Sequence, residues 1–110
     1  MSGIVRVNYG DVEGGDKTVT MSYGTITVPA NTPITITVSK KAKAIDLVRS
    51  NNTSVYFTSV DNNVGGWNVL ERSDGVASGM NMKFTDNSIV SDTQFSNAAI
   101  TFVYTIFYEE

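Results

Sequence analysis

The sequence predicts an all-β protein, an antiparallel β-sandwich of jelly-roll type with about eight to ten strands, formed by residues 1–110 as one domain. Composition is the first reason: Val, Ile and Thr supply 35 of the 110 residues, whereas Leu, Ala, Glu and Gln supply 13. Branched side chains lose rotamer freedom in a helix but pack well on a pleated sheet. The second reason is that turn-forming clusters recur about every ten residues, which is typical of sandwiches and barrels. These clusters lie at residues 14–16, 29–33, 50–52, 61–66, 73–75 and 86–88.

Alternation of apolar and polar residues marks most of the strands. Val5, Val7 and Tyr9 indicate the first strand. In residues 19–23 apolar and hydroxyl side chains take opposite faces, so one face should be buried and the other hydrated. The remaining strands are expected at residues 34–38, 44–49, 55–57, 67–70, 80–84 and 100–108.

Residues 39–49 are compatible with two structures. Ala42, Ile45 and Val48 recur at three-residue spacing, as they would on a helix. We favour a basic turn that leads into a strand at residues 44–49, because the apolar residues run directly into a polar turn and a further strand.

The last strand, residues 100–108, is partly apolar on both faces. The even-numbered residues from Ile100 to Tyr108 are all apolar or aromatic, and the opposite face carries Val103 and Phe107 among threonines. Either a loop covers this second face or it packs on another subunit, since contiguous exposed apolar surface usually marks an interface. Val103 and Phe107 are therefore candidate residues of an oligomer interface.

Composition and charge exclude several classes of function. The chain contains no Cys and no His, which excludes Ser-His-Asp and Cys-His nucleophilic sites, zinc sites with imidazole or thiolate ligands, and redox thiols. The formal net charge of -3 argues against nucleic acid or an anionic membrane as a partner, because both attract a cationic face. No apolar run approaches the roughly 20 residues that span a bilayer, so membrane insertion is not expected.

The N-terminal residues lack the basic region and apolar stretch of an export signal. We therefore expect the chain to be made in the cytoplasm without a signal peptide. For the same reason the overlapping glycosylation sequons at residues 51–54 are interpreted as a polar turn.

Carboxylates are the only remaining candidates for acid–base catalysis. The 11 Asp and Glu residues lie mostly in predicted turns, whereas a glycosidase needs two that face each other across a cleft at about 5 to 9.5 Å. The clusters at residues 61–63 and 86–88 contain oxygen ligands of the kind calcium prefers, but neither continues into a complete calcium-binding loop. We predict no catalytic residues, no metal site and no cofactor.

Trp67, the only tryptophan, lies near Asp61, Asn62 and Asn63. In sugar-binding sandwiches an exposed aromatic ring stacks on a pyranose while Asn and Asp groups bond its hydroxyls, so these four residues are candidate ligand-binding residues. A lone Trp in a small domain also fits the core. Three lysines at residues 40, 41 and 43 form a modest basic patch. They suit an anionic glycan or teichoic-type polymer, or else are solvated turn residues that discourage edge-to-edge aggregation.

Several segments resemble the small distal domains of bacteriophage and prophage tail fibres, over about two thirds of the chain. Residues 43–52, KAIDLVRSNN, are similar to a strand and turn that recurs in those domains. Residues 82–90, MKFTDNSIV, and residues 95–106, FSNAAITFVYTI, are similar to their ending. There a strand enters an Asp-Asn turn, a short apolar strand follows, and an aromatic-rich strand closes the domain. The resemblance implies a virion component, usually a homotrimer, whose loops touch a bacterial surface polysaccharide or protein, and it implies no catalytic residues.

We therefore expect a non-enzymatic, tail-fibre-like domain of a phage or prophage virion that oligomerises and contacts a bacterial cell surface. The alternative is a free-standing carbohydrate-binding module with an aromatic platform around Trp67. A minimal glycoside hydrolase with paired carboxylates is the third hypothesis.

Overall fold

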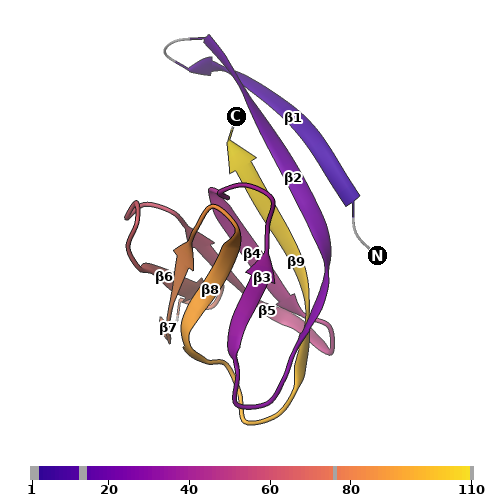
Figure 1. The fold of residues 1–110 in the computed structure, drawn as a ribbon. Helices are drawn as coiled ribbons and strands as arrows, with labels where there is room; N and C mark the ends of the chain where they lie inside the picture. Colours follow the sequence, from indigo (N-terminus) through magenta and orange to yellow (C-terminus); the bar gives the residue numbers. More distant parts are fainter. Residues whose placement is uncertain (1–2, 13–14, 76, 110) are drawn as a thin grey trace.

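The computed structural model describes the backbone of residues 3–12, 15–75 and 77–109, and the side chains of residues 19–51, 56–75 and 78–109. Every regular element in these residues is a β-strand, and all the pairings are antiparallel, which confirms the predicted fold class (Figure 1). None of the described residues belongs to a helix that could cross a membrane.

Nine strands make up this part of the chain, a number within the predicted range. They are β1 (Gly3–Val12), β2 (Gly15–Val28), β3 (Pro33–Thr37), β4 (Ala44–Arg49), β5 (Asn52–Val60), β6 (Asn68–Arg72), β7 (Ala77–Phe84), β8 (Ser88–Gln94) and β9 (Ile100–Glu109). The favoured interpretation of residues 39–49, a turn that leads into a strand, is confirmed by β4. The predicted turn at residues 14–16 lies partly outside the described residues, because residue 14 is not among them.

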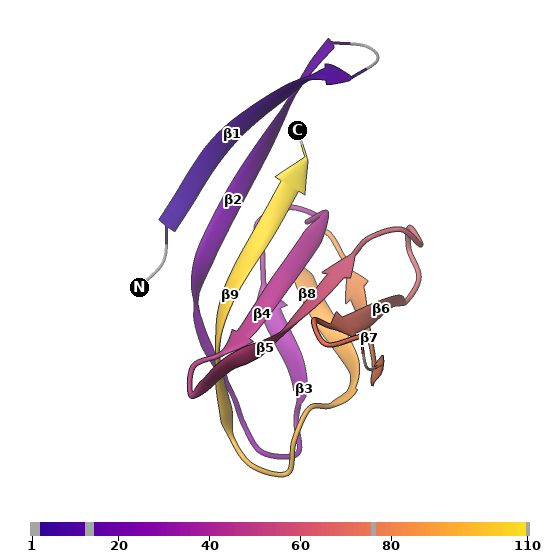
Figure 2. The same ribbon diagram turned by 180° about the vertical axis from the view of Figure 1, so that it is seen from behind.

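All nine strands belong to one sheet, in the order β1-β2-β9-β4-β5-β6-β7-β8-β3. The sheet bends sharply between β5 and β6, which are paired only at Phe57 with Arg72 and at Thr58 with Glu71. It therefore forms two layers, β1-β2-β9-β4-β5 and β6-β7-β8-β3, which face each other as the layers of a sandwich do (Figures 1 and 2). The last strand in the order, β3, comes back into contact with β2, so the sheet is nearly closed.

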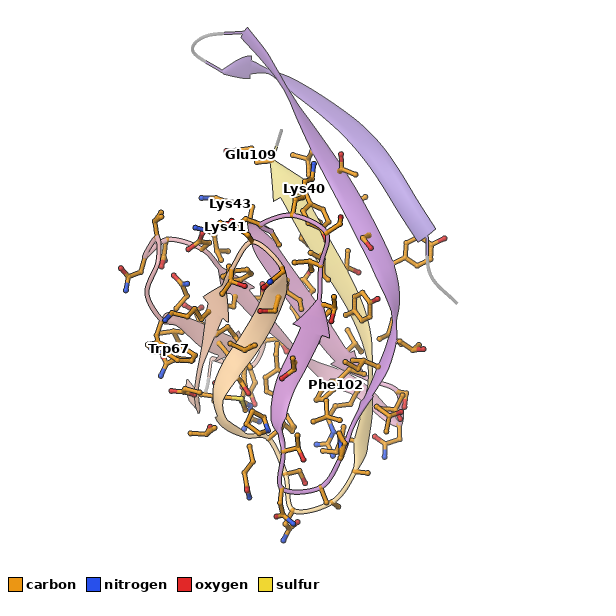
Figure 3. All side chains as sticks on the ribbon, in the orientation of Figure 1. Lys40, Lys41, Lys43, Trp67, Phe102 and Glu109 are labelled. Atoms are coloured by element: carbon orange, nitrogen blue, oxygen red, sulfur yellow. The ribbon has the colours of Figure 1, made fainter. Side chains whose placement is uncertain are left out.

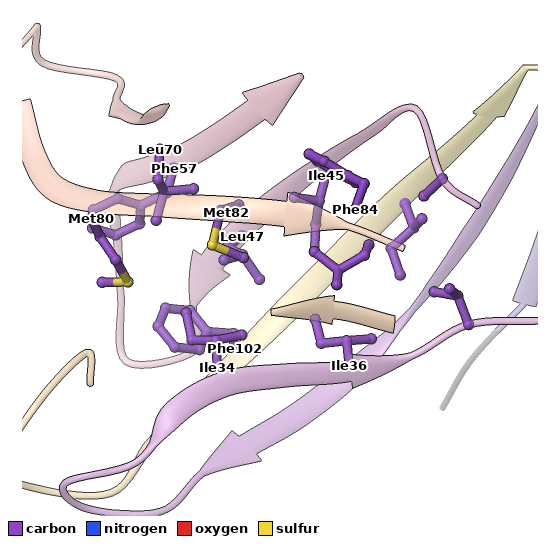
Figure 4. Packing of buried hydrophobic residues seen from close by; sticks show 14 of the residues in the cluster. Ile34, Ile36, Ile45, Leu47, Phe57, Leu70, Met80, Met82, Phe84 and Phe102 are labelled. Carbon is purple, nitrogen blue, oxygen red and sulfur yellow. The ribbon is translucent and has the colours of Figure 1, made fainter. Parts of the chain in front are cut away.

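The hydrophobic core lies between these two layers. Phe102 on β9 and Ile34 on β3 are both 0% exposed and face each other across the core (Figure 4). The ring of Phe95 packs edge-on against Phe57 and Phe102, at centroid distances of 5.3 and 4.9 Å. The inward positions of Phe102 and Ile34 follow from the two-residue alternation of their strands. The rest of the core consists of aliphatic, methionine and aromatic side chains from both layers.

The β1–β2 hairpin extends beyond the two layers (Figures 1 and 2).

Along β2 the apolar residues change face at Gly24. The pairing with β9 is regular from Val19 to Val28, and Val28 is buried in the core, whereas Tyr23 is 40% exposed and Thr20 is buried. Because alternate residues of a regular strand take opposite faces, the apolar side of residues 19–23 lies on the outside of the large layer.

Candidate binding depression and outer sheet face

A depression opens on the outside of the sheet where β5 and β6 diverge. Beyond the pair Thr58 and Glu71 the two strands no longer bond through their backbones; instead the hydroxyl of Ser59 donates to the carbonyl of Val69 at 2.9 Å. The divergence leaves an open hollow of about 370 Å³. Its lining consists of Thr58, Ser59, Val60, Asn62, Asn63, Trp67, Asn68, Val69 and Glu71.

The lining combines exposed apolar groups with polar ones. Val60, Trp67 and Val69 are 45%, 43% and 57% exposed, and Trp67 lies at the side of the small layer (Figure 3). Such a hollow, with a few apolar walls and convergent polar groups, is the usual form of a small-ligand site. The exposed indole is therefore available to a ligand rather than part of the core.

One buried side chain organises the loop that closes the depression. Asn68 is 2% exposed, and its Oδ1 accepts hydrogen bonds from the backbone N–H of Asn62 at 3.0 Å and of Asn63 at 2.8 Å. Its Nδ2 donates to the carbonyls of Gly66 and Met82, both at 3.4 Å. Because an unpaired backbone group is costly when buried, these bonds hold the loop in one conformation.

The glycines of this loop are required by its geometry. Gly65 has a φ of +79°, a left-handed conformation that side chains disfavour. A Cβ on Gly66 would come within 2.6 Å of Asn63 Nδ2, which donates to the carbonyl of Trp67 at 3.2 Å. The turn predicted at residues 61–66 thus sets the position of the indole ring.

Some polar groups of the lining remain available to a ligand. The side chains of Thr58, Asn62 and Glu71 make no hydrogen bond or ion pair with any described residue. Asn63 and Asn68, in contrast, use their side chains within the loop. The hollow therefore offers a hydroxyl, an amide and a carboxylate beside an aromatic ring.

Three of the four predicted ligand-binding residues lie together in the depression: Trp67, Asn62 and Asn63. Asp61 does not line it. Asp61 is 5% exposed, its Oδ2 pairs with Lys41 Nζ at 3.4 Å, and its Oδ1 accepts from Asn68 Nδ2 at 3.5 Å. Its carboxylate thus ties the loop to the turn before β4 instead of facing a ligand.

The three lysines before β4 are engaged within the molecule (Figure 3). Lys41 pairs with Asp61, and Lys43 Nζ donates to the backbone carbonyl of Asp61 at 3.1 Å. Lys40 Nζ lies 5.4 Å from the ring centroid of Tyr108. Burial of that ring, with a smaller contribution from Tyr104, raises the pKa of Tyr108. Lys41 and Lys43 thus tie the turn to Asp61, while Lys40 and Lys43 remain exposed.

The second face of β9 is a separate candidate surface. Val103 is 43% exposed, so no described loop covers it, and its neighbours across the sheet are Thr25 on β2 and Val48 on β4. Phe107 is partly buried between Met21 and Ala44. Tyr23 and Tyr56 add exposed rings to the same side, at 40% and 48%. The outward residues Met21 and Tyr23 of β2 therefore extend the partly apolar outer face that Val103 and Phe107 form on β9.

No three acidic side chains gather closely enough to hold a metal ion within the described part of the chain. Glu71 and Thr58 were not identified from the sequence, although a signal was present. Trp67 and Val69 alternate along the predicted strand of residues 67–70, and Glu71, one residue beyond it, continues the alternation on the same face. The hydrogen bonds of Asn68 had no such signal, because the partners include Met82 on a different strand.

Comparison of the chain with protein-family models, curated proteins and solved structures finds no match.

Proposed function

We propose that this protein is a non-enzymatic attachment domain of a phage or prophage virion, which oligomerises and contacts a bacterial cell surface. The observation that carries oligomerisation is the outward apolar face of β2 and β9, where Tyr23 and Val103 are exposed. A monomer rarely leaves a contiguous apolar strip on a sheet uncovered. The segments that resemble tail-fibre domains, residues 43–52, 82–90 and 95–106, support the virion assignment.

Light scattering combined with size-exclusion chromatography tests the oligomer. We expect a homotrimer at micromolar concentration, and Val103→Lys should dissociate it, because a charge in a buried apolar contact is costly. Val64→Lys is the matched control, since Val64 is 78% exposed in the loop between β5 and β6. A wild-type chain that stays monomeric, or a Val103→Lys chain that assembles as the wild type does, contradicts this part of the proposal.

The second candidate function, a free-standing carbohydrate-binding module, is supported by the depression beside Trp67. Stacking of an exposed indole on a sugar ring combines apolar burial with hydrogen bonds at the ring's edge. Thr58, Asn62 and Glu71 have the free donors and acceptors for such bonds. Both functions use the same hollow, and they differ in whether the chain acts as an oligomer.

A glycan array with Trp67→Ala, combined with the oligomeric state from light scattering, separates these functions. The substitution should weaken binding about tenfold or more, because it removes the stacking surface. Asn97→Ala serves as the control, since it removes an exposed side chain that lies outside both the depression and the outward face of β2 and β9. Monomeric binding that is lost in Trp67→Ala favours the module, and an oligomer that binds favours the attachment domain. Binding unchanged in Trp67→Ala would exclude the depression as the sugar site.

A further inference from the structure

We infer that the depression selects sugars by charge: it binds amino sugars in preference to neutral sugars, and neutral sugars in preference to sugars that carry a carboxylate, with Glu71 setting this order. The inference rests on the proposed binding of a sugar beside Trp67 and adds the chemical class of the ligand.

The first observation is the charge of the lining. Among the nine residues of the lining, only Glu71 carries a charge at neutral pH, and that charge is negative. Glu71 is exposed and makes no hydrogen bond or ion pair with a described residue. Its charge is therefore directed to solvent or to a ligand rather than neutralised within the fold.

The second observation is that no Lys or Arg side chain of the described residues lines the hollow. Lys83 Nζ lies 5.3 Å from the ring centroid of Trp67 but does not line the hollow. Arg72, the residue after Glu71, has its Nη2 bonded to Asp74 Oδ2 at 2.6 Å. Lys41 and Lys43 contact Asp61. A sugar carboxylate next to Glu71, at the end of the hollow away from Trp67 and Lys83, would therefore meet a like charge without a lining cation to compensate.

The third observation is where Glu71 lies relative to the indole. Trp67, which directly precedes β6, and Glu71 on β6 are four residues apart and both line the hollow, about 13 Å from each other if the chain between them is extended. This spacing exceeds a single sugar ring. A short oligosaccharide that stacks on Trp67 can thus bring a second ring close to Glu71, beside Thr58, its register partner on β5.

The test measures the affinities of three β-1,4-linked tetrasaccharides, of glucosamine, glucose and glucuronate, at pH 6 and low salt. Trp67 fluorescence reports the binding, since the chain has one tryptophan. An exposed charge pair changes affinity by about two- to fivefold, so we expect glucosamine to bind tighter than glucose, and glucose tighter than glucuronate, by about that factor at each step. About 0.5 M salt should flatten the order.

Two variants assign the effect to the depression. Glu71→Gln should remove the preference, so that the three tetrasaccharides bind with the same affinity, because the amide can still hydrogen-bond a hydroxyl but carries no charge. Asp86→Asn makes the same change in net charge in the turn between β7 and β8 and should retain the preference.

Glucuronate binding as tight as glucose in the wild type would overturn the inference, and so would an order that survives in Glu71→Gln. Equal binding of all three sugars overturns the inference but leaves the proposed sugar site in place. Absence of any Trp67 response to all three overturns both.

Discussion

The side chain of Asn68 has five hydrogen-bond partners. Its Oδ1 accepts from the backbones of residues 62 and 63, and the two hydrogens of its Nδ2 are shared among the carbonyls of residues 66 and 82 and the carboxylate of Asp61. It is an amide at an inward position where the neighbouring Leu70 is apolar. A carboxamide can both accept and donate, which neither a carboxylate nor an aliphatic group can do at this position. The shape of the depression therefore depends on this residue more than on those that line it.

Replacing this amide tests that role. Asn68→Ala should lower the free energy of unfolding by about 2 to 4 kcal/mol, because it leaves several buried backbone groups without partners. Urea denaturation measures the loss. Asn97→Ala, at an exposed position, should stay within about 0.5 kcal/mol of the wild type. Equal stability of the two variants would show that the loop does not depend on Asn68.

Asp92, on the outside of the small layer, makes a pH-dependent contribution to the free energy of unfolding. Its Oδ1 accepts from the backbone N–H of Asn81 at 3.0 Å and its Oδ2 from Asn81 Nδ2 at 2.9 Å. The side-chain hydrogen bond from Asn81, followed by the backbone bond, lowers the pKa of Asp92 below its usual value. Because the folded pKa is the lower one, the stabilisation is present above the unfolded value of about 3.9 and is lost as the pH falls through the folded pKa.

The difference in unfolding free energy between the wild type and Asp92→Asn should therefore be constant from about pH 6 to pH 5 and shrink below about pH 4. Since this carboxylate is exposed, the difference should be less than about 1 kcal/mol. Urea denaturation at a series of pH values measures it. A difference that grows on acidification would contradict the sign.

In β9, two consecutive residues contribute to stability in different ways, one in the core and one on the exposed face. Phe102 is 0% exposed and packs on Phe95, and Val103 is 43% exposed on the opposite face. Phe102→Ala should destabilise the protein by about 3 to 5 kcal/mol, because it leaves a cavity in the core. Val103→Ala should cost less than about 1 kcal/mol in the monomer, since little apolar area is lost.

Urea denaturation at nanomolar concentration, below the range in which the homotrimer is expected, compares these two variants. Repeating it at high concentration then shows whether Val103 gains importance when oligomers form, because association adds stability by mass action. A large loss in Val103→Ala at every concentration would place its side chain in the core instead.

For the molecule as a whole, the central pairing joins distant parts of the chain. β2 pairs with β9 from Val19 opposite Glu109 to Val28 opposite Ile100. This pairing closes a loop that contains residues 29–99, which costs chain entropy before the core contacts form. The two layers therefore form together, when distant segments of the chain come into contact, and not one strand at a time.

Refolding should accordingly be slow for a chain of this size, with a relaxation time in the millisecond-to-second range typical of all-β domains. Stopped-flow dilution from urea, followed by Trp67 fluorescence and by far-ultraviolet circular dichroism, measures the rate. The rate should not change with concentration in the low micromolar range, where folding precedes association. Refolding within microseconds would contradict the topology.

Much of this architecture is encoded locally. Alternation is a property of each strand, so the sequence of residues 100–108 is enough to place Phe102 and Val103 on opposite faces. Likewise β4 is predicted from a run of apolar residues that ends in a polar turn, and the loop before Trp67 from its glycines and Asx residues. These features need no knowledge of the rest of the chain.

The sequence of a single strand does not tell which of its two faces another layer will cover. Residues 19–23 alternate as clearly as any segment, yet their apolar side faces outward, because the small layer covers only the opposite face of β2 and β9. The depression also depends on where β5 and β6 stop pairing and on the bond from Asn68 to Met82 on β7. Burial and hydrogen-bond satisfaction are set by neighbours from distant segments, so these outcomes emerge only when the two layers have packed together.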